Sequence, residues 1–110
     1  MAGAGSANFR AVTWPTDLGG TEHRFEVAGE IDLPQPAAAL VMLPGISENP
    51  NILVLELEPL TLHEQITTPV VTREKAGYLL VQGPPFEFET VQVYLKGDLV
   101  ATVEVHIIHS

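Results

Sequence analysis

The chain has 110 residues, which suffices for one hydrophobic core and is too short for a second domain. Fourteen acidic residues against five basic ones give a formal charge of −9, which opposes phosphate binding and excludes nucleic acid and anionic membrane as expected partners. There is no cysteine, and this excludes disulfides, thiolate metal sites and a cysteine nucleophile.

The N-terminal residues 1–8, MAGAGSAN, lack the basic and apolar regions of a secretory signal, so we interpret them as a flexible leader or an expression scar. We therefore expect a single domain over residues 9–110. No run of about 18 apolar residues occurs that would span a bilayer. The missing signal and the missing membrane span together favour a cytoplasmic location.

Period-two alternation and short apolar runs bounded by proline and glycine predict an all-β chain. The first expected strand is residues 9–14, which Pro15 ends. The second, residues 22–33, alternates most regularly and presents one face to water and one to the core. The side chains that we expect to face the core are those of His23, Phe25, Val27, Ile31 and Leu33.

The middle of the chain contains two apolar runs, residues 37–43 and 52–57, that end near prolines and alternate poorly. Residues 67–72 contain Pro69, which cannot donate to a ladder, so they predict an edge strand or a bulge. Another strand is expected at residues 78–82. The last two, residues 91–95 and 99–107, form a hairpin in which Gly97-Asp98 fits a type II′ turn.

About eight such strands without helical crossovers predict an antiparallel two-sheet β-sandwich, Ig-like or jelly-roll. Several of these strands are apolar on both faces, and a two-sheet sandwich has no third layer to cover the second face. We therefore expect a homo-oligomer that buries apolar strand faces. The residues that we place in this interface are Val54, Val100, His106 and Ile108.

Strict alternation along residues 99–108 places Val100, His106 and Ile108 on one face, and Ala101 on the other. An interface that buries a neutral His106 would weaken at low pH. His106 and His109 are an odd number of residues apart, so they point to opposite faces and do not form a paired site.

The remaining chemistry-bearing residues form no recognised motif. Glu56 with Glu58, and Glu87 with Glu89, are same-face pairs that we expect to be solvated. Ser47 lies in a segment similar to the nucleophile elbow, but the second glycine and the following helix are missing, so we do not expect catalysis there. No metal or cofactor is expected.

We accordingly expect a non-catalytic binding or assembly module, with a basic protein as a further possible partner because of the acidic charge. Two alternatives stay open. One is a sandwich that binds a small ligand, a sugar or a divalent cation through loop residues, namely Trp14, Asp17, Glu48, Asn49 and Asn51. The other is a small hydrolase or metalloenzyme that uses His23, His63 or His106 with a nearby carboxylate.

Overall fold

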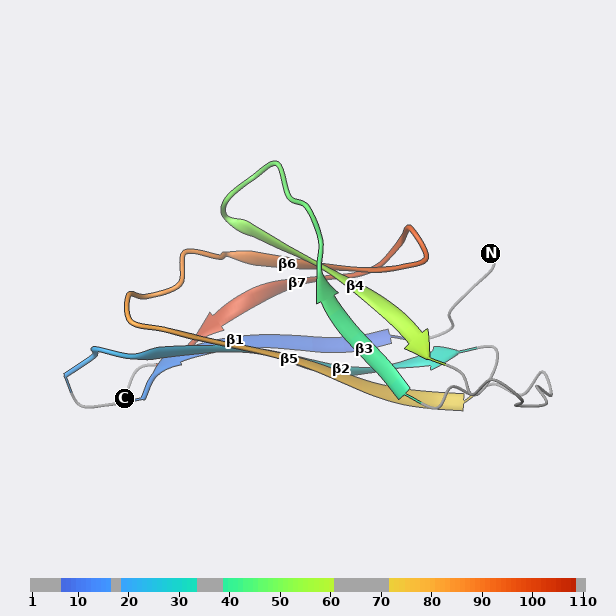
Figure 1. Ribbon diagram of the computed structural model, residues 1–110, viewed down its shortest axis with the longest axis horizontal. Helices are drawn as coiled ribbons and strands as arrows, with labels where there is room; N and C mark the ends of the chain where they lie inside the picture. The colour runs from blue at the N-terminus through green and yellow to red at the C-terminus, as the bar shows by residue number, and fades with distance from the viewer. Residues whose placement is uncertain (1–6, 17–18, 34–38, 61–71, 109–110) are drawn as a thin grey trace.

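The computed structural model describes residues 7–16, 19–33, 39–60 and 72–108, and these form seven β-strands and no helix (Figure 1). The all-β prediction is confirmed, whereas an antiparallel two-sheet sandwich of about eight strands is not. Within the described ranges no helix is present that could cross a membrane. The strands are β1 (Ala7–Pro15), β2 (His23–Leu33), β3 (Ala39–Pro44), β4 (Ile52–Leu60), β5 (Thr72–Gln82), β6 (Thr90–Leu95) and β7 (Asp98–Ile107).

The seven described strands lie in one mixed sheet, in the order β3-β4-β6-β7-β1-β2-β5. The pairs β4–β6 and β1–β7 are parallel, and the other four pairs are antiparallel. Strands β3 and β5, at the two ends of this order, contact each other, so the sheet is nearly closed into a barrel. No crossover helix is required for the parallel pairs, because their partners are not consecutive in the chain.

The core is formed by side chains that alternate inward along the strands, as the period of two requires. On β2 the predicted inward set is confirmed for Phe25, Val27, Ile31 and Leu33, all of which are buried. On β5 the alternation is also regular, with Ala76 buried and Tyr78 packed against the core. The other buried apolar residues are Phe9, Ala11, Leu40, Met42, Leu53, Leu55, Leu57, Val91, Val93 and Leu95.

The glycine in the middle of β2 is required by its neighbour. Gly29 lies opposite Phe9 of β1, at an inward position where the other β2 residues carry large side chains. A Cβ at Gly29 would collide with the Asn8 carbonyl oxygen and with the Phe9 side chain. The Phe9 ring therefore occupies the space that a side chain at residue 29 would fill.

Two phenylalanines extend this core beyond the strands by packing on Phe25 of β2. The rings of Phe86 and Phe88, in the connection between β5 and β6, each lie with their centroids 5.4 Å from the Phe25 centroid. Tilted and edge-on arrangements at this separation are favourable for aromatic pairs. The connection is thus fixed to the core, and it delivers the chain to β6.

The C-terminal hairpin turns one residue earlier than the sequence predicts. Leu95 pairs with Asp98, so the two central residues are Lys96 and Gly97, with φ of 52° and 86°. Positive φ at both central residues is the signature of a type I′ turn, whose twist matches that of the flanking strands. The predicted type II′ turn at Gly97-Asp98 is therefore wrong.

A β-bulge in the same hairpin changes which side chains face inward. Val93 pairs with Ala101, but Tyr94 pairs with Leu99, so Val100 has no partner in this ladder. Both Val100 and Ala101 pack against the core. The prediction that Val100 shares a face with His106 is wrong, because the extra residue interrupts the alternation.

β5 is much longer than the strand that the sequence predicts at residues 78–82. β5 begins at Thr72, six residues before the predicted strand at residues 78–82. The expected edge strand or bulge around Pro69 lies outside the described residues, apart from Thr72 itself.

Candidate functional site

Outward side chains of β7, β1, β2 and β5 form one candidate surface, which we name the Trp14 face. Its members are Val12, Trp14, Arg24, Glu26, Leu79, Val81, His106 and Ile108. The strand register places them in rows, since residues paired across strands share a face of the sheet. One row runs from His106 through Val12 and Glu26 to Leu79, and the next contains Trp14, Arg24 and Val81.

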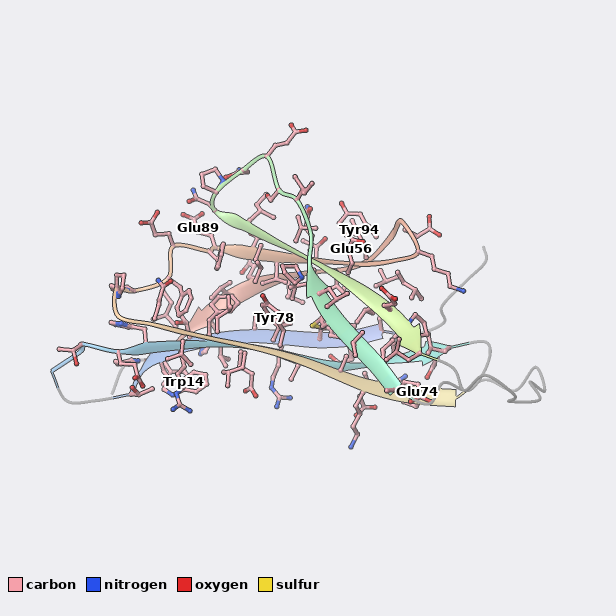
Figure 2. All side chains as sticks on the ribbon, viewed as in Figure 1. Trp14, Glu56, Glu74, Tyr78, Glu89 and Tyr94 are labelled. Carbon is pink, nitrogen blue, oxygen red and sulfur yellow. The ribbon has the colours of Figure 1, made fainter. Side chains whose placement is uncertain are left out.

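The Trp14 face contains a shallow, mainly apolar depression of about 360 Å³. Figure 2 shows Trp14 on the outer side of the β1-β2-β5 layer, whereas Tyr78 points to the interior. Beside the depression, Leu79 and Val81 are each about half exposed, at 52% and 51%. The residues that line it are Val12, Trp14, Pro15, Glu26 and Ile108.

Basic residues concentrate on the same side of the sheet. Four of the five in the chain, Arg10, Arg24, Arg73 and Lys75, occupy outward positions of β1, β2 and β5. Arg73 donates hydrogen bonds to the carboxylates of Glu30 at 2.7 Å and of Asp32 at 2.8 Å. These bonds raise the pKa of the Arg73 guanidinium, and they fix β5 to β2 on the outer face.

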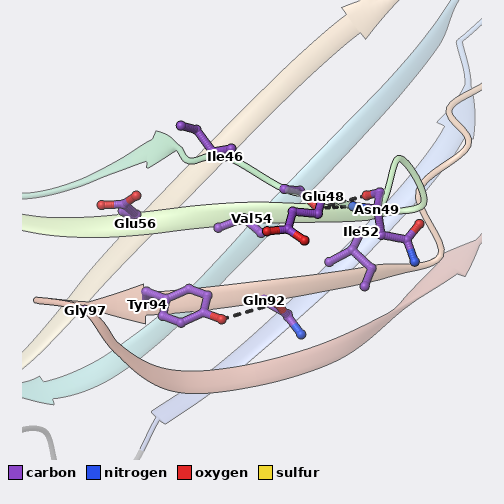
Figure 3. A pocket seen from close by; sticks show the side chains of 10 residues that line it. Ile46, Glu48, Asn49, Ile52, Val54, Glu56, Gln92, Tyr94 and Gly97 are labelled. Atoms are coloured by element: carbon purple, nitrogen blue, oxygen red, sulfur yellow. Dashed lines mark hydrogen bonds between the residues drawn. The ribbon is translucent and has the colours of Figure 1, made fainter.

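A second candidate surface, the Tyr94 groove, lies on the outer side of β4 and β6 and has a volume of about 460 Å³ (Figure 3). Its floor consists of outward residues of the two parallel strands, in which Val54 pairs with Gln92 and Glu56 with Tyr94. The loop between β3 and β4 and the β6–β7 turn border it. The lining residues are Ile46, Ser47, Glu48, Asn49, Ile52, Val54, Glu56, Gln92, Tyr94 and Gly97.

The loop that borders the Tyr94 groove is held by its own short polar side chains. The Ser47 hydroxyl donates to the Asn49 carbonyl oxygen at 2.8 Å, and the Asn49 side-chain oxygen accepts from the Asn51 amide at 2.9 Å. The Asn51 carbonyl in turn accepts from the Glu89 amide at 2.8 Å, which joins the loop to the entry of β6. Local bonds of this kind stabilise turns.

The predicted ligand-binding residues are divided between the two surfaces. Glu48 and Asn49 come together at the Tyr94 groove, Asn51 supports its loop, and Trp14 lies on the Trp14 face. Asp17 is outside the described residues. The sequence analysis missed Tyr94 and Gln92, although their outward position could have been read from the alternation between buried Val91, Val93 and Leu95.

The predicted interface residues are divided as well. Ile108 and His106 lie on the Trp14 face, Val54 lies in the floor of the Tyr94 groove, and Val100 packs against the core. These four residues therefore do not form one continuous patch through which two copies could associate.

The histidines do not converge in the described part of the chain. His106 is exposed and outward, whereas His23 follows the inward parity of β2 and its Nδ1 lies 2.8 Å from the Gly83 carbonyl oxygen. His63 and His109 lie outside the described residues. Among the residues that the structure places, no group of three or more histidine and acidic side chains could hold a metal ion.

Glu56 and Glu58 share the outer face of β4, and Glu56 alone of the two lines the groove. Glu87 and Glu89 belong to the connection before β6, with exposed side chains. The two candidate surfaces thus lie on opposite outer sides of the molecule, as the positions of Trp14 and Tyr94 in Figure 2 show. Comparisons of the chain with protein-family models, with curated proteins and with solved structures found no match.

Proposed function

We propose that the protein is a non-catalytic binding module that self-associates by covering the Trp14 face with a second copy. The observation that carries this proposal is a pair of exposed aliphatic side chains on β5, Leu79 and Val81, next to the depression of the Trp14 face. Their exposed fractions are 52% and 51%, and that of Ile108 is 46%. Contiguous exposed apolar side chains rimmed by charged ones are typical of interaction surfaces.

The charges of the Trp14 face favour a second copy as the occupant. Each copy carries −9, so two copies attract each other only where basic side chains of one copy meet acidic side chains of the other. The outer side of β1, β2 and β5 offers both kinds, since it carries four basic side chains together with Glu26, Glu30 and Asp32. Arg24 and Glu26 are two residues apart on one strand face, so a two-fold axis near β2 would bring Arg24 of one copy to Glu26 of the other.

The exposure of Leu79 and Val81 sets how much free energy of association they can contribute. Complete burial of one aliphatic side chain contributes about 1.5–3 kcal/mol, and about half of each side chain is still available for burial here. Removing both aliphatic side chains should therefore reduce the free energy of association by about 2 kcal/mol, which raises the dissociation constant about thirtyfold.

Sedimentation velocity over a micromolar concentration series tests this proposal. The double variant Leu79→Ser/Val81→Thr should dissociate at concentrations at which the parent protein is associated. Leu99→Ser is the matched control, because Leu99 is equally exposed at 51% but lies beside Tyr94 on the other outer side. A parent protein that stays monomeric, or a control that dissociates as readily as the double variant, would contradict the proposal.

A further inference from the structure

The Tyr94 groove combines apolar side chains in its floor with two carboxylates, Glu56 in the floor and Glu48 in the bordering loop, that have no cationic partner among the described residues. Ile52 and Val54 supply aliphatic surface, and Tyr94 supplies an aromatic ring directly across from Glu56. Figure 3 shows Glu48 reaching from the loop to the same side of the strands as Tyr94. The described ion pairs belong to Arg24 and Arg73, on the opposite outer side of the molecule.

The part of the molecule around the Tyr94 groove is strongly acidic. Residues 39–60 and 83–108 contain a single basic residue, Lys96, at the tip of the β6–β7 turn. The negative potential of this half attracts cations, and within the described ranges no basic side chain pairs with a groove carboxylate. Its seven acidic residues are Glu48, Glu56, Glu58, Glu87, Glu89, Asp98 and Glu104.

We propose that the Tyr94 groove binds the side chain of a lysine presented by a partner polypeptide. The aliphatic stem would lie on Ile52 and Val54, and the ammonium group would lie over the Tyr94 ring between the two carboxylates. Aromatic faces attract ammonium groups, and carboxylates add a charge-assisted hydrogen bond. This inference goes beyond self-association, because it concerns the other outer side of the molecule.

Two features favour a side chain on a polypeptide over a metal ion or a free amine. A hard divalent cation takes several oxygen ligands, whereas the other side-chain oxygens of the groove are already hydrogen-bonded. The Ser47 hydroxyl donates to the Asn49 carbonyl oxygen, Asn49 Oδ1 accepts from the Asn51 amide, and Gln92 Oε1 accepts from the Tyr94 hydroxyl. Ile46, at the edge of the groove, is 93% exposed. An isolated amine would leave Ile46 uncovered, but residues flanking a bound lysine would reach it.

The test is a titration of the ¹⁵N-labelled protein with the peptide acetyl-Leu-Lys-Leu-amide, followed by amide chemical shifts. Shifts should concentrate at residues 46–49, 52–56 and 92–97. The same peptide with norleucine in place of lysine should bind at least about fivefold more weakly, because it retains the apolar stem and loses the charge. Raising the salt concentration should weaken binding of the lysine peptide and leave binding of the norleucine peptide unchanged.

Substitutions assign the binding to individual groove residues. Glu56→Gln and Tyr94→Leu should each raise the dissociation constant of the lysine peptide about two- to fivefold. Glu58→Gln is the matched control, since Glu58 is the next outward carboxylate on β4 and does not line the groove. The proposal is overturned if lysine and norleucine peptides bind equally, if Glu58→Gln weakens binding as much as Glu56→Gln, or if n-butylamine binds as tightly as the lysine peptide.

Discussion

Replacing Gly29 with alanine should destabilise the protein, because the added methyl group has no room between β2 and β1. Gly29 lies inward and opposite Phe9, and its added Cβ would collide with the Asn8 carbonyl oxygen and with the Phe9 ring. The same Cβ would lie 2.6 Å from the Phe9 Cα atom. Two of these three contacts involve backbone atoms, which cannot move aside by rotating a side chain.

The magnitude follows from that geometry. An ordinary carbon–carbon contact is about 3.5 Å, so β1 and β2 would have to separate by about 0.9 Å at this point. Overpacking of this kind costs about 1–3 kcal/mol, and alanine regains about 0.4–1 kcal/mol by restricting the unfolded chain. The difference is a net loss of about 1–2 kcal/mol, which should lower the urea midpoint by about 0.5–1 M at a slope of about 2 kcal/mol/M, the middle of the range for small domains.

Gly77→Ala is the matched control for this measurement. Gly77 is also in the middle of a strand, and among the described residues its added Cβ would meet the Val27 carbonyl oxygen alone, at the ordinary distance of 3.6 Å. This variant should be neutral or stabilised by up to about 1 kcal/mol. Equal urea midpoints for the two variants would refute the conclusion that Phe9 and β1 leave no room at residue 29.

Three further substitutions test other parts of the fold by urea unfolding. Phe25→Leu should cost about 2–3 kcal/mol, because it removes core volume and both ring contacts at 5.4 Å; a loss below about 1 kcal/mol would contradict the three-ring cluster. Lys96→Asn should stabilise the protein by about 0.5 kcal/mol, because asparagine tolerates positive φ in a type I′ turn, and a destabilised variant would argue for a different turn. Thr13→Val should cost about 1 kcal/mol, because the buried Thr13 hydroxyl donates to the Arg24 carbonyl oxygen at 2.7 Å; an unchanged midpoint would show that this bond contributes nothing.

The sequence predicts the inward face of β2 well, because apolar side chains alternate with polar ones between Phe25 and Leu33; His23, at the start of the strand, is only partly buried. Phe25, Val27, Ile31 and Leu33 alternate with polar residues, and each of them is buried. The first half of β5 is not predictable in the same way. Its outward Arg73 is explained only by the carboxylates of β2 that it meets, and this pairing between distant segments is not visible in the local pattern.

Pairing between distant segments also explains why the candidate surfaces could be predicted only in fragments. The parallel register of β4 with β6 brings Tyr94 opposite Glu56, and the parallel register of β1 with β7 brings His106 opposite Val12. Neither follows from alternation, which assigns a residue to a face but not to a neighbour. The bulge at Val100 adds a second effect, because it reverses the facing of one end of β7 relative to the other.

Because of that reversal, the two ends of β7 contribute outward side chains to the two different surfaces. β7 pairs with β6 near the turn and with β1 near its end, so one strand borders the Tyr94 groove and the Trp14 face. Leu99 stands beside Tyr94 before the bulge, and His106 stands beside Val12 after it. The two surfaces use different residues on opposite outer sides, so a copy bound at the Trp14 face would leave the Tyr94 groove open. An assembled protein should therefore bind the lysine peptide as tightly as a dissociated Leu79→Ser/Val81→Thr variant does.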